Sequence, residues 1–177
     1  DGSYENIKIT TPEDLRMENR LGTGFDVHRF AADRKLILGG VEIPYEKGLL
    51  GHSDADVLTH AVIDAMLGAA ALGDIGRIFP DSDPAYRDIS SMDLLMRTWN
   101  TVRDRGYSVV NVDATIICEK PGLSPYITRM KESIADVLSI DAGRVSIKAT
   151  TTEQLGFTGR EEGIAAQAVC LLAGAPR

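Results

Sequence analysis

The chain has 177 residues, of which 44% are hydrophobic and 25% charged, and its formal net charge is −7. This composition is typical of one globular domain with its own core, and no apolar run reaches the roughly 18 residues that a membrane-spanning helix needs. The acidic balance argues against nucleic acid or an anionic membrane as a partner, because both repel a negatively charged surface.

A polar leader and two strands are predicted first along the chain. Residues 1–19 carry a turn or cap pattern at Thr10–Asp14, so we interpret them as a leader or linker ahead of one domain at residues 20–177. Leu21–Phe30 and Lys35–Ile43 are predicted strands. The second strand ends at a Gly-Gly pair and a proline, which mark a bulge or turn.

The longest predicted helix spans about Asp54–Leu72, because apolar residues recur there at helical spacing after a capping-box-like start. A loop rich in Gly, Pro and Asp follows over residues 73–87. Ser90 or Ser91 then caps a second predicted helix that runs to Arg105.

The second half of the chain is predicted to alternate strands and helices. Its elements are a buried strand at Tyr107–Cys118, a helix at Tyr126–Leu138, a strand at Arg144–Thr150 and a closing helix at Glu162–Ala173. This order predicts an α+β fold with a single four-stranded mixed sheet that helices cover on one face. The other face of the sheet then needs a partner.

The two cysteines indicate the cellular compartment. Cys118 and Cys170 lie in apolar runs, and neither belongs to a Cys-x-x-Cys pair. Buried core side chains explain them better than a disulfide or a metal site. This usage is typical of a reducing compartment, so we expect a cytoplasmic protein.

The three histidines lie within 33 positions of one another, among several aspartates. Asp26 and His28 are two residues apart on a predicted strand, so both side chains project from the same face as a possible pair of metal ligands. A simple Asp–His pair explains this spacing equally well. His60 lies between Asp56 and Asp64 on the long helix and makes a polar stripe on an apolar element. Two imidazoles and a carboxylate suit zinc with an open fourth position, and Asp56 or Asp64 can orient the ring of His60.

Two further segments have the side chains that phosphate and metal binding require. His52 and Ser53 precede the long helix, whose first backbone N–H groups favour an anion, whereas an N-cap role explains Ser53 alone. The hydroxyls of residues 150–152 and the carboxylate of Glu153 suit phosphate oxygens and a hard Mg²⁺ or Mn²⁺ ion. Threonines are also common in strands, so this pattern has a structural alternative.

Two predicted loops complete the candidate site. The aspartates of residues 74–83 can bind the hydroxyls of a polyol or contact a metal, but turn formation explains them as well. Residues 119–124 follow a buried strand and can present backbone groups to a flat base, or form a plain loop.

Three sequence blocks carry a family resemblance: GTGFDVHRF at residues 22–30, GGVEIPYEKGLLGHSDADVLTHAVIDAMLGAAALGDIGRIFPDSDP at 39–84 and KATTTEQLGFTGREEGIA at 148–165. Over residues 21–172 the chain resembles the 2-C-methyl-D-erythritol 2,4-cyclodiphosphate synthase family. The resemblance implies a cyclising phosphorus–oxygen lyase of non-mevalonate isoprenoid precursor biosynthesis. Its reaction is attack by the 2-phosphate of a cytidine diphosphate-linked methylerythritol phosphate on the β-phosphorus, which releases CMP.

The resemblance also implies roles for single residues. Asp26, His28 and His60 match zinc ligands, and Glu153 matches the ligand of Mg²⁺ or Mn²⁺. His52 and Thr151 match catalytic positions that stabilise the transition state. The implied substrate contacts are Ser53, Asp64, Asp74, Ile75, Gly76, Phe79, Asp81, Ser82, Asp83, Glu119, Lys120, Pro121, Gly122, Leu123, Ser124, Thr150, Thr152, Phe157 and Arg160.

The implied assembly is a homotrimer around a three-fold axis, with nucleotide sites between subunits. Phe157, Arg160 and Glu162 match positions around an axial cavity that holds an isoprenoid diphosphate in some members. Two residues depart from the family pattern: Gly122 stands where lysine is common, and Glu161 stands where glycine is usual. The first removes a side-chain contact to the nucleotide, and the second adds negative charge near the cavity.

Residues 1–18 resemble the C-terminal tail of the 2-C-methyl-D-erythritol 4-phosphate cytidylyltransferase that some bacteria fuse ahead of this synthase. We therefore expect the C-terminal part of a bifunctional protein of the bacterial cytoplasm. Two alternatives remain, a metal-dependent phosphohydrolase and a catalytically idle trimer that binds isoprenoid diphosphates. The four candidate metal ligands argue against the idle trimer.

Overall fold

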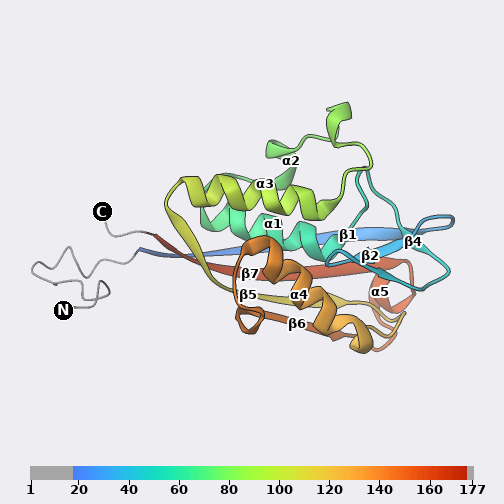
Figure 1. The fold of residues 1–177 in the computed structure, drawn as a ribbon. Helices are drawn as coiled ribbons and strands as arrows, with labels where there is room; N and C mark the ends of the chain where they lie inside the picture. Colours follow the sequence, from blue (N-terminus) through green and yellow to red (C-terminus); the bar gives the residue numbers. More distant parts are fainter. Residues whose placement is uncertain (1–17, 175–177) are drawn as a thin grey trace, which may run out of the picture.

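The computed structural model describes residues 18–174 and shows a sheet with helices packed on one face (Figure 1). The predicted leader at residues 1–19 lies almost entirely outside the described residues. The main sheet has five strands in the order β4-β1-β7-β5-β6. These strands are β1 Asn19–Ala31, β4 Gly48–Leu49, β5 Tyr107–Ile117, β6 Val145–Thr150 and β7 Gly163–Gly174. The α+β class is confirmed, but the prediction of four strands is wrong.

The sheet is mixed, as predicted. β1 and β7 pair antiparallel along almost their whole length, β7 and β5 are also antiparallel, and β5 and β6 are parallel. The three longer helices are α1 Val57–Ala69, α3 Ser91–Asp104 and α4 Ile127–Leu138, and the short ones are α2 Ile75–Ile78 and α5 Gly156–Gly159. All three longer helices agree with predicted ones, although α1 is shorter at both ends than the predicted helix.

The predicted closing helix at Glu162–Ala173 is wrong, because this segment is β7, a strand with paired neighbours on both sides. Its run of alanines and aliphatic residues is almost continuously buried. Such a run lacks the alternation that identifies a half-exposed strand, so periodicity cannot distinguish it from a buried helix. Pairing with both β1 and β5 determines its structure.

The predicted strand at Lys35–Ile43 is a hairpin that forms a separate two-stranded sheet. Its strands are β2 Leu36–Leu38 and β3 Val41–Ile43. Gly39 and Gly40 form the turn with φ angles of 57° and 71°, in the left-handed region that glycine adopts readily. The Gly-Gly pair therefore marks a turn, as the sequence indicated.

Helix α1 lies directly against β1 because β1 carries glycine at two inward positions. A Cβ atom on Gly22 would come within 2.0 Å of the Ala65 carbonyl oxygen, and one on Gly24 would come equally close to that of Ala61. The close approach brings His60, the residue before Ala61, onto the strand that carries Asp26 and His28.

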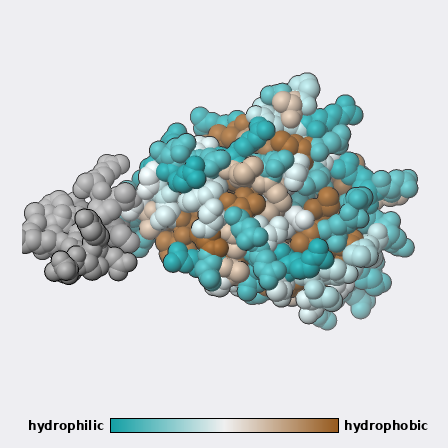
Figure 2. Space-filling view, viewed as in Figure 1, coloured by the Kyte–Doolittle hydropathy of each residue, from teal (hydrophilic) through white to brown (hydrophobic). Residues whose placement is uncertain are grey.

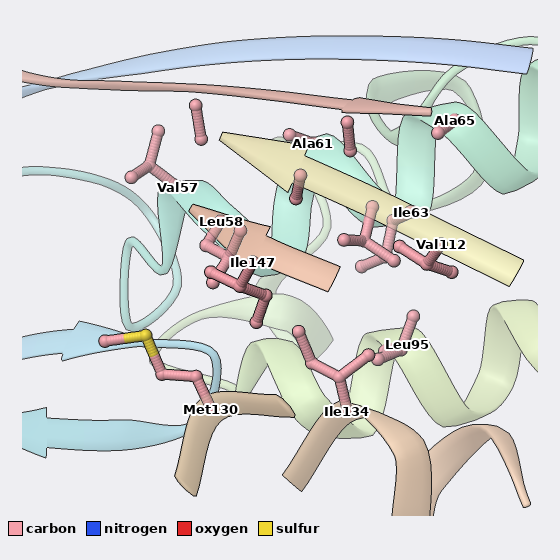
Figure 3. Packing of buried hydrophobic residues seen from close by; sticks show 14 of the residues in the cluster. Val57, Leu58, Ala61, Ile63, Ala65, Leu95, Val112, Met130, Ile134 and Ile147 are labelled. Atoms are coloured by element: carbon pink, nitrogen blue, oxygen red, sulfur yellow. The ribbon is translucent and has the colours of Figure 1, made fainter. Parts of the chain in front are cut away.

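The core fills the space between the sheet and the helices (Figure 3). Figure 3 shows Leu58 of α1, Leu95 of α3 and Ile134 of α4 directed toward the inner face of the sheet, where Val112 and Ile147 lie. These five side chains are buried, and burying a large aliphatic side chain contributes about 1.5–3 kcal/mol. The core therefore fixes the helices relative to the strands that carry the site.

The outer face of the sheet exposes large apolar side chains. On β1, Leu21, Phe25 and Val27 are 66%, 59% and 39% exposed. The space-filling view in Figure 2 shows separate hydrophobic patches among hydrophilic areas. In residues 18–174 we find no helix of the length and hydrophobicity that crossing a bilayer requires.

Candidate functional site

Asp26, His28 and His60 converge at one point between β1 and α1. His60 Nδ1 lies 2.9 Å from Asp26 Oδ2, His28 Nε2 lies 3.0 Å from the same oxygen, and the two nitrogens are 3.1 Å apart. Tetrahedral zinc with bonds of about 2.0–2.1 Å places its ligand atoms roughly 3.3–3.4 Å apart. A shift of a few tenths of an ångström therefore fits the three residues to zinc.

On each histidine ring, the nitrogen that points away from Asp26 has a hydrogen-bond partner of its own. His28 Nδ1 lies 2.8 Å from the carbonyl oxygen of Leu50, which can only accept, so Nδ1 carries the hydrogen. His60 Nε2 lies 2.8 Å from Ser91 Oγ and 3.2 Å from Ser53 Oγ. The opposite nitrogen of His28 therefore directs its lone pair at the Asp26 carboxylate when the ring is neutral, and a proton or a bound metal ion relieves the repulsion between them.

The two aspartates that we expected at the His60 ring have other partners. Asp56 is fully buried, caps α1 and accepts hydrogen bonds from the backbone of Gly39 and Gly40. Asp64 accepts the N–H of Ile75 at 2.8 Å. The prediction that either one orients the ring is wrong. The sequence did not reveal Ser91, because it resembles an ordinary helix-start residue.

The electrostatics of this centre favour a positive charge. Burial alone would raise the pKa of Asp26, but its hydrogen bonds with His28 and His60 hold that pKa well below the usual range. Burial lowers the pKa of His28, yet the hydrogen bond to Asp26, the negative charge of Asp26 and the hydrogen bond to the Leu50 carbonyl together outweigh it and raise the pKa overall. A proton or a divalent cation can supply the charge that the three ligands require.

A cavity of about 240 Å³ opens beside Asp26, His28 and His60. His52 lines it, and its buried Nε2 has no hydrogen-bond partner among the described residues. Ser53 also lines it, and its Oγ accepts the N–H of Ala55. Asp56, not Ser53, caps α1, so the N-cap interpretation of Ser53 is wrong. The remaining lining residues are Asp26, His28, Gly51, His60, Ile75, Gly76, Phe79, Asp81, Tyr86 and Leu94.

The acidic loop contributes only part of its predicted residues to this cavity. Asp81 lines it, whereas Asp74 caps α2 and Asp83 caps a short 3-10 helix. Ser82 is not among the lining residues. Turn and cap formation therefore explains two of the predicted aspartates, and the polyol interpretation is best supported for Asp81.

A second cavity of about 250 Å³ lies at the carboxyl end of β6. Nearby, the Thr151 hydroxyl donates to Glu153 at 2.7 Å, and the Glu119 carboxylate accepts the N–H groups of Thr152 and Gln154. These bonds hold the 151–154 loop against the 118–124 loop. The cavity is lined by Cys118, Glu119, Pro121, Gly122, Leu123, Ser124, Ala149, Thr150 and Thr151.

Four more predicted residues line neither cavity. Lys120 pairs with Glu161 at 2.9 Å, and Arg160 pairs with Glu162 at 2.7 Å. The hydroxyl of Thr152 donates to the Leu155 carbonyl at 2.6 Å. Phe157 lies on α5 and is partly exposed.

The sheet register separates the two cavities. Val27, Ala165, Ile117 and Thr150 form one row across β1, β7, β5 and β6. Three strand spacings of about 4.8 Å place the ends of this row roughly 14 Å apart. Within one chain, the structure therefore does not bring Glu153 and Thr151 together with the three converging ligands.

A model of the YgbB family matches residues 19–173. The 2-C-methyl-D-erythritol 2,4-cyclodiphosphate synthase of Geobacillus thermodenitrificans is 63% identical over 153 residues, which cover 86% of this chain and 96% of that protein. The bifunctional enzyme IspD/IspF of Desulforudis audaxviator is 59% identical over 179 residues, covering 97% of this chain but 45% of that enzyme. The chain thus spans less than half of the bifunctional relative.

Solved structures give the same two kinds of match. The bifunctional IspDF from Campylobacter jejuni has a TM-score of 0.88 and 41% identity, covering 99% of this chain and 50% of that one. A CDP-bound 2C-methyl-D-erythritol-2,4-cyclodiphosphate synthase has a TM-score of 0.80 and 35% identity, covering 86% of this chain and 99% of that one.

Proposed function

The chain belongs to the YgbB family, and from this premise we propose that it synthesises 2-C-methyl-D-erythritol 2,4-cyclodiphosphate. An oxygen of the substrate's 2-phosphate forms a bond to the β-phosphorus, and the bond from that phosphorus to the CMP oxygen breaks. The observation that carries the proposal is the convergence of Asp26, His28 and His60 beside a cavity lined by His52 and Ser53.

Zinc is the proposed ion for Asp26, His28 and His60, because two imidazoles and one carboxylate suit it and leave a position open. We assign Mg²⁺ or Mn²⁺ to Glu153, whose carboxylate suits a hard cation. When bound, the two ions polarise phosphate oxygens and offset their negative charge. The acidic chain has a net charge of −7, so its diphosphate substrate requires this compensation.

The chain's own residues position the substrate and donate hydrogen bonds. The Nε2 atom of His52 can donate to a phosphate oxygen. Ser53 Oγ accepts from the Ala55 N–H, so its own hydrogen can point into the cavity. A phosphate monoester is largely dianionic near pH 7, with a second pKa of about 6, so the attacking group needs no general base.

A trimer explains how the two cavities act on one substrate. They lie about 14 Å apart across the sheet of one chain, farther than a single diphosphate spans. In the proposed trimer, the cavity beside Asp26, His28 and His60 of one subunit therefore has to face the cavity at the end of β6 of a neighbouring subunit. The exposed Leu21, Phe25 and Val27 on the outer sheet face favour its burial around a three-fold axis.

The same assembly has an axial cavity near Phe157, for which we propose an isoprenoid diphosphate as the occupant. Glu162 already pairs with Arg160, and Glu161 adds a carboxylate next to it.

We further propose that residues 20–177 form the synthase domain of a bifunctional protein. The match to the Desulforudis audaxviator enzyme over 97% of the chain supports this arrangement.

The test is to incubate the protein with 4-diphosphocytidyl-2-C-methyl-D-erythritol 2-phosphate and Mg²⁺ and to follow phosphorus by NMR. We expect CMP and a cyclic diphosphate, and we expect a chelator to suppress both. Inorganic phosphate would identify a phosphohydrolase instead. A folded, zinc-loaded trimer that forms no product would overturn the proposal in favour of a binding protein.

A further inference from the structure

The outer nitrogen of His60 continues into a hydrogen-bond chain that the proposed reaction does not itself use. Ser91, the first residue of α3, is fully buried, and its Oγ lies 2.8 Å from His60 Nε2. The Ser91 hydroxyl donates to one carboxylate oxygen of Asp54, and the Ser91 backbone N–H donates to the other at 3.0 Å. Asp54 thus holds Ser91 at two points.

The direction of this chain follows from which groups can donate. An ionised carboxylate only accepts, so the single hydroxyl hydrogen of Ser91 points to Asp54. Ser91 Oγ must then accept from His60 Nε2–H. Nδ1 is left without a hydrogen, and its lone pair faces Asp26 and His28. One carboxylate thereby selects the tautomer of His60 that can bind a metal.

Backbone hydrogen bonds fix Asp54 and Ser91 to the wall of the cavity. The N–H of Asp88 donates to the His52 carbonyl at 3.0 Å, and the N–H of Asp54 donates to the Ile89 carbonyl at 3.2 Å. The segment that leads into α3 is therefore tied to the loop that carries His52. Displacing Ser91 would disturb the His60 ring and this loop together.

We propose that Asp54 and Ser91 are positioning residues for His60, which set its tautomer and orientation for metal binding. The proposal rests on the zinc site of the proposed function. If the two residues only join the 52–54 loop to α3, their loss changes stability and leaves metal affinity unaltered. Positioning residues instead change the affinity itself, commonly by about 10–100-fold.

The first experiment measures Zn²⁺ affinity of the purified chain by competition with a chromogenic chelator. We expect Ser91→Ala to weaken Zn²⁺ binding about 10–100-fold and Ser91→Thr, which keeps the hydroxyl, to restore most of the loss. Ser90→Ala is the matched control, because Ser90 caps the same helix through Met92 N–H. We expect the control to bind Zn²⁺ like the unmodified chain.

A second variant addresses the tautomer directly. In Asp54→Asn, an amide NH₂ group can replace the oxygen that accepts from the Ser91 hydroxyl, so Ser91 donates to His60 Nε2 instead. We expect ¹⁵N NMR of the zinc-stripped protein to show the hydrogen moving from Nε2 to Nδ1. Unchanged tautomer and equal Zn²⁺ affinities in all variants would overturn the positioning role while leaving the proposed function intact. Absence of Zn²⁺ binding by the unmodified chain would overturn the metal site itself.

Discussion

Among single residues, His60 connects the largest number of site features, because its ring joins Asp26 and His28 on one side and Ser91 on the other. We expect His60→Ala to remove most bound zinc and to abolish turnover while the fold persists. The core clusters around other α1 residues, so circular dichroism should change little. Metal content by atomic absorption and the CMP assay provide the test. Full activity without zinc would refute the ligand assignment.

Glu153 permits a test of the second ion alone. Glu153→Gln keeps an acceptor for the Thr151 hydroxyl but removes the negative charge. We expect zinc content to stay constant while the Mg²⁺ or Mn²⁺ concentration for half-maximal rate rises about tenfold or more. Titration of Mg²⁺ at fixed substrate measures this shift. An unaltered requirement would contradict the role of Glu153.

The pKa shifts at the metal centre predict opposite pH dependences with and without zinc. The raised pKa of His28 stabilises the metal-free fold at low pH, and this stabilisation is lost as the pH rises through that pKa. The lowered pKa of Asp26 stabilises it above the usual aspartate pKa of about 3.9, and that contribution is lost in stronger acid. The pair therefore stabilises the metal-free protein most between about pH 4 and 6.5.

Zinc competes with the proton on His28, so its affinity should fall by up to about tenfold per pH unit below the raised pKa. We expect zinc to raise Tm more at pH 8 than at pH 6. Thermal scans with and without zinc at both values check this expectation. An equal rise would mean that His28 does not lose a proton on binding.

Residue spacing was sufficient to point to the three side chains that converge, but not to the residues that support them. Asp26-x-His28 on a strand and His60 between two helical aspartates are local patterns. Ser91 lies 31 residues from His60 along the chain, and only the packing of α3 against α1 brings them together. The hydroxyl also resembles a helix cap, which is the role of its neighbour Ser90.

At the level of elements, the contact between α1 and β1 determines whether the ligands meet. Gly24→Ala would place a Cβ within 2.0 Å of the Ala61 carbonyl oxygen. We expect it to destabilise the fold by about 1–3 kcal/mol and to weaken zinc binding, because α1 must move away from β1. Chemical denaturation and chelator competition measure the two effects.

Gly68→Ala is the matched control on the same contact, because its Cβ would lie 3.7 Å from the Thr23 carbonyl oxygen, at ordinary contact distance. Helix propensity favours alanine over glycine by about 1 kcal/mol. The control should therefore equal or exceed the unmodified chain in stability. Equal stability of the two variants would show that the close approach at Gly24 is not needed.

Strands and helices with one exposed face were predictable, and fully buried ones were not. β1 alternates between faces and α4 is amphipathic, so their patterns are visible in the sequence. β7 is buried on both faces along most of its length, and such a pattern does not distinguish a strand from a buried helix. α1 begins at Val57 because the Asp56 side chain accepts the Thr59 N–H and caps the helix. Ser53, three residues earlier, is an equally good cap by residue type, so the sequence alone places the start of the helix too early.

For the whole molecule, we expect the outer sheet face to hold the trimer together. Phe25→Glu places a charge on a side chain that is 59% exposed in the single chain. It should dissociate the trimer and reduce turnover at least about tenfold, while each subunit still binds zinc. Analytical ultracentrifugation, zinc content and the CMP assay test this together. An active monomer would exclude a site shared between subunits.

The sequence predicted the class of the fold. Two strands of the main sheet were not predicted: β4, which has only two residues and pairs with β1 at Phe30 and Ala31, and β7, whose buried run fits a helix equally well. The roughly 14 Å between the cavities follows from the strand order, which long-range pairing alone determines.

The pairing of β1 with β7 also sets a transport distance. Asn19 lies opposite Ala173, and His28 lies nine residues further along β1, about 30 Å away at 3.3 Å per residue. Any domain attached ahead of Asn19 would therefore be tethered about 30 Å from His28, and an intermediate released at that tether point would diffuse about this distance before it reacts. Covalent fusion would then raise the local concentration of the intermediate without direct hand-over, and an added trap for it should intercept part of the flux.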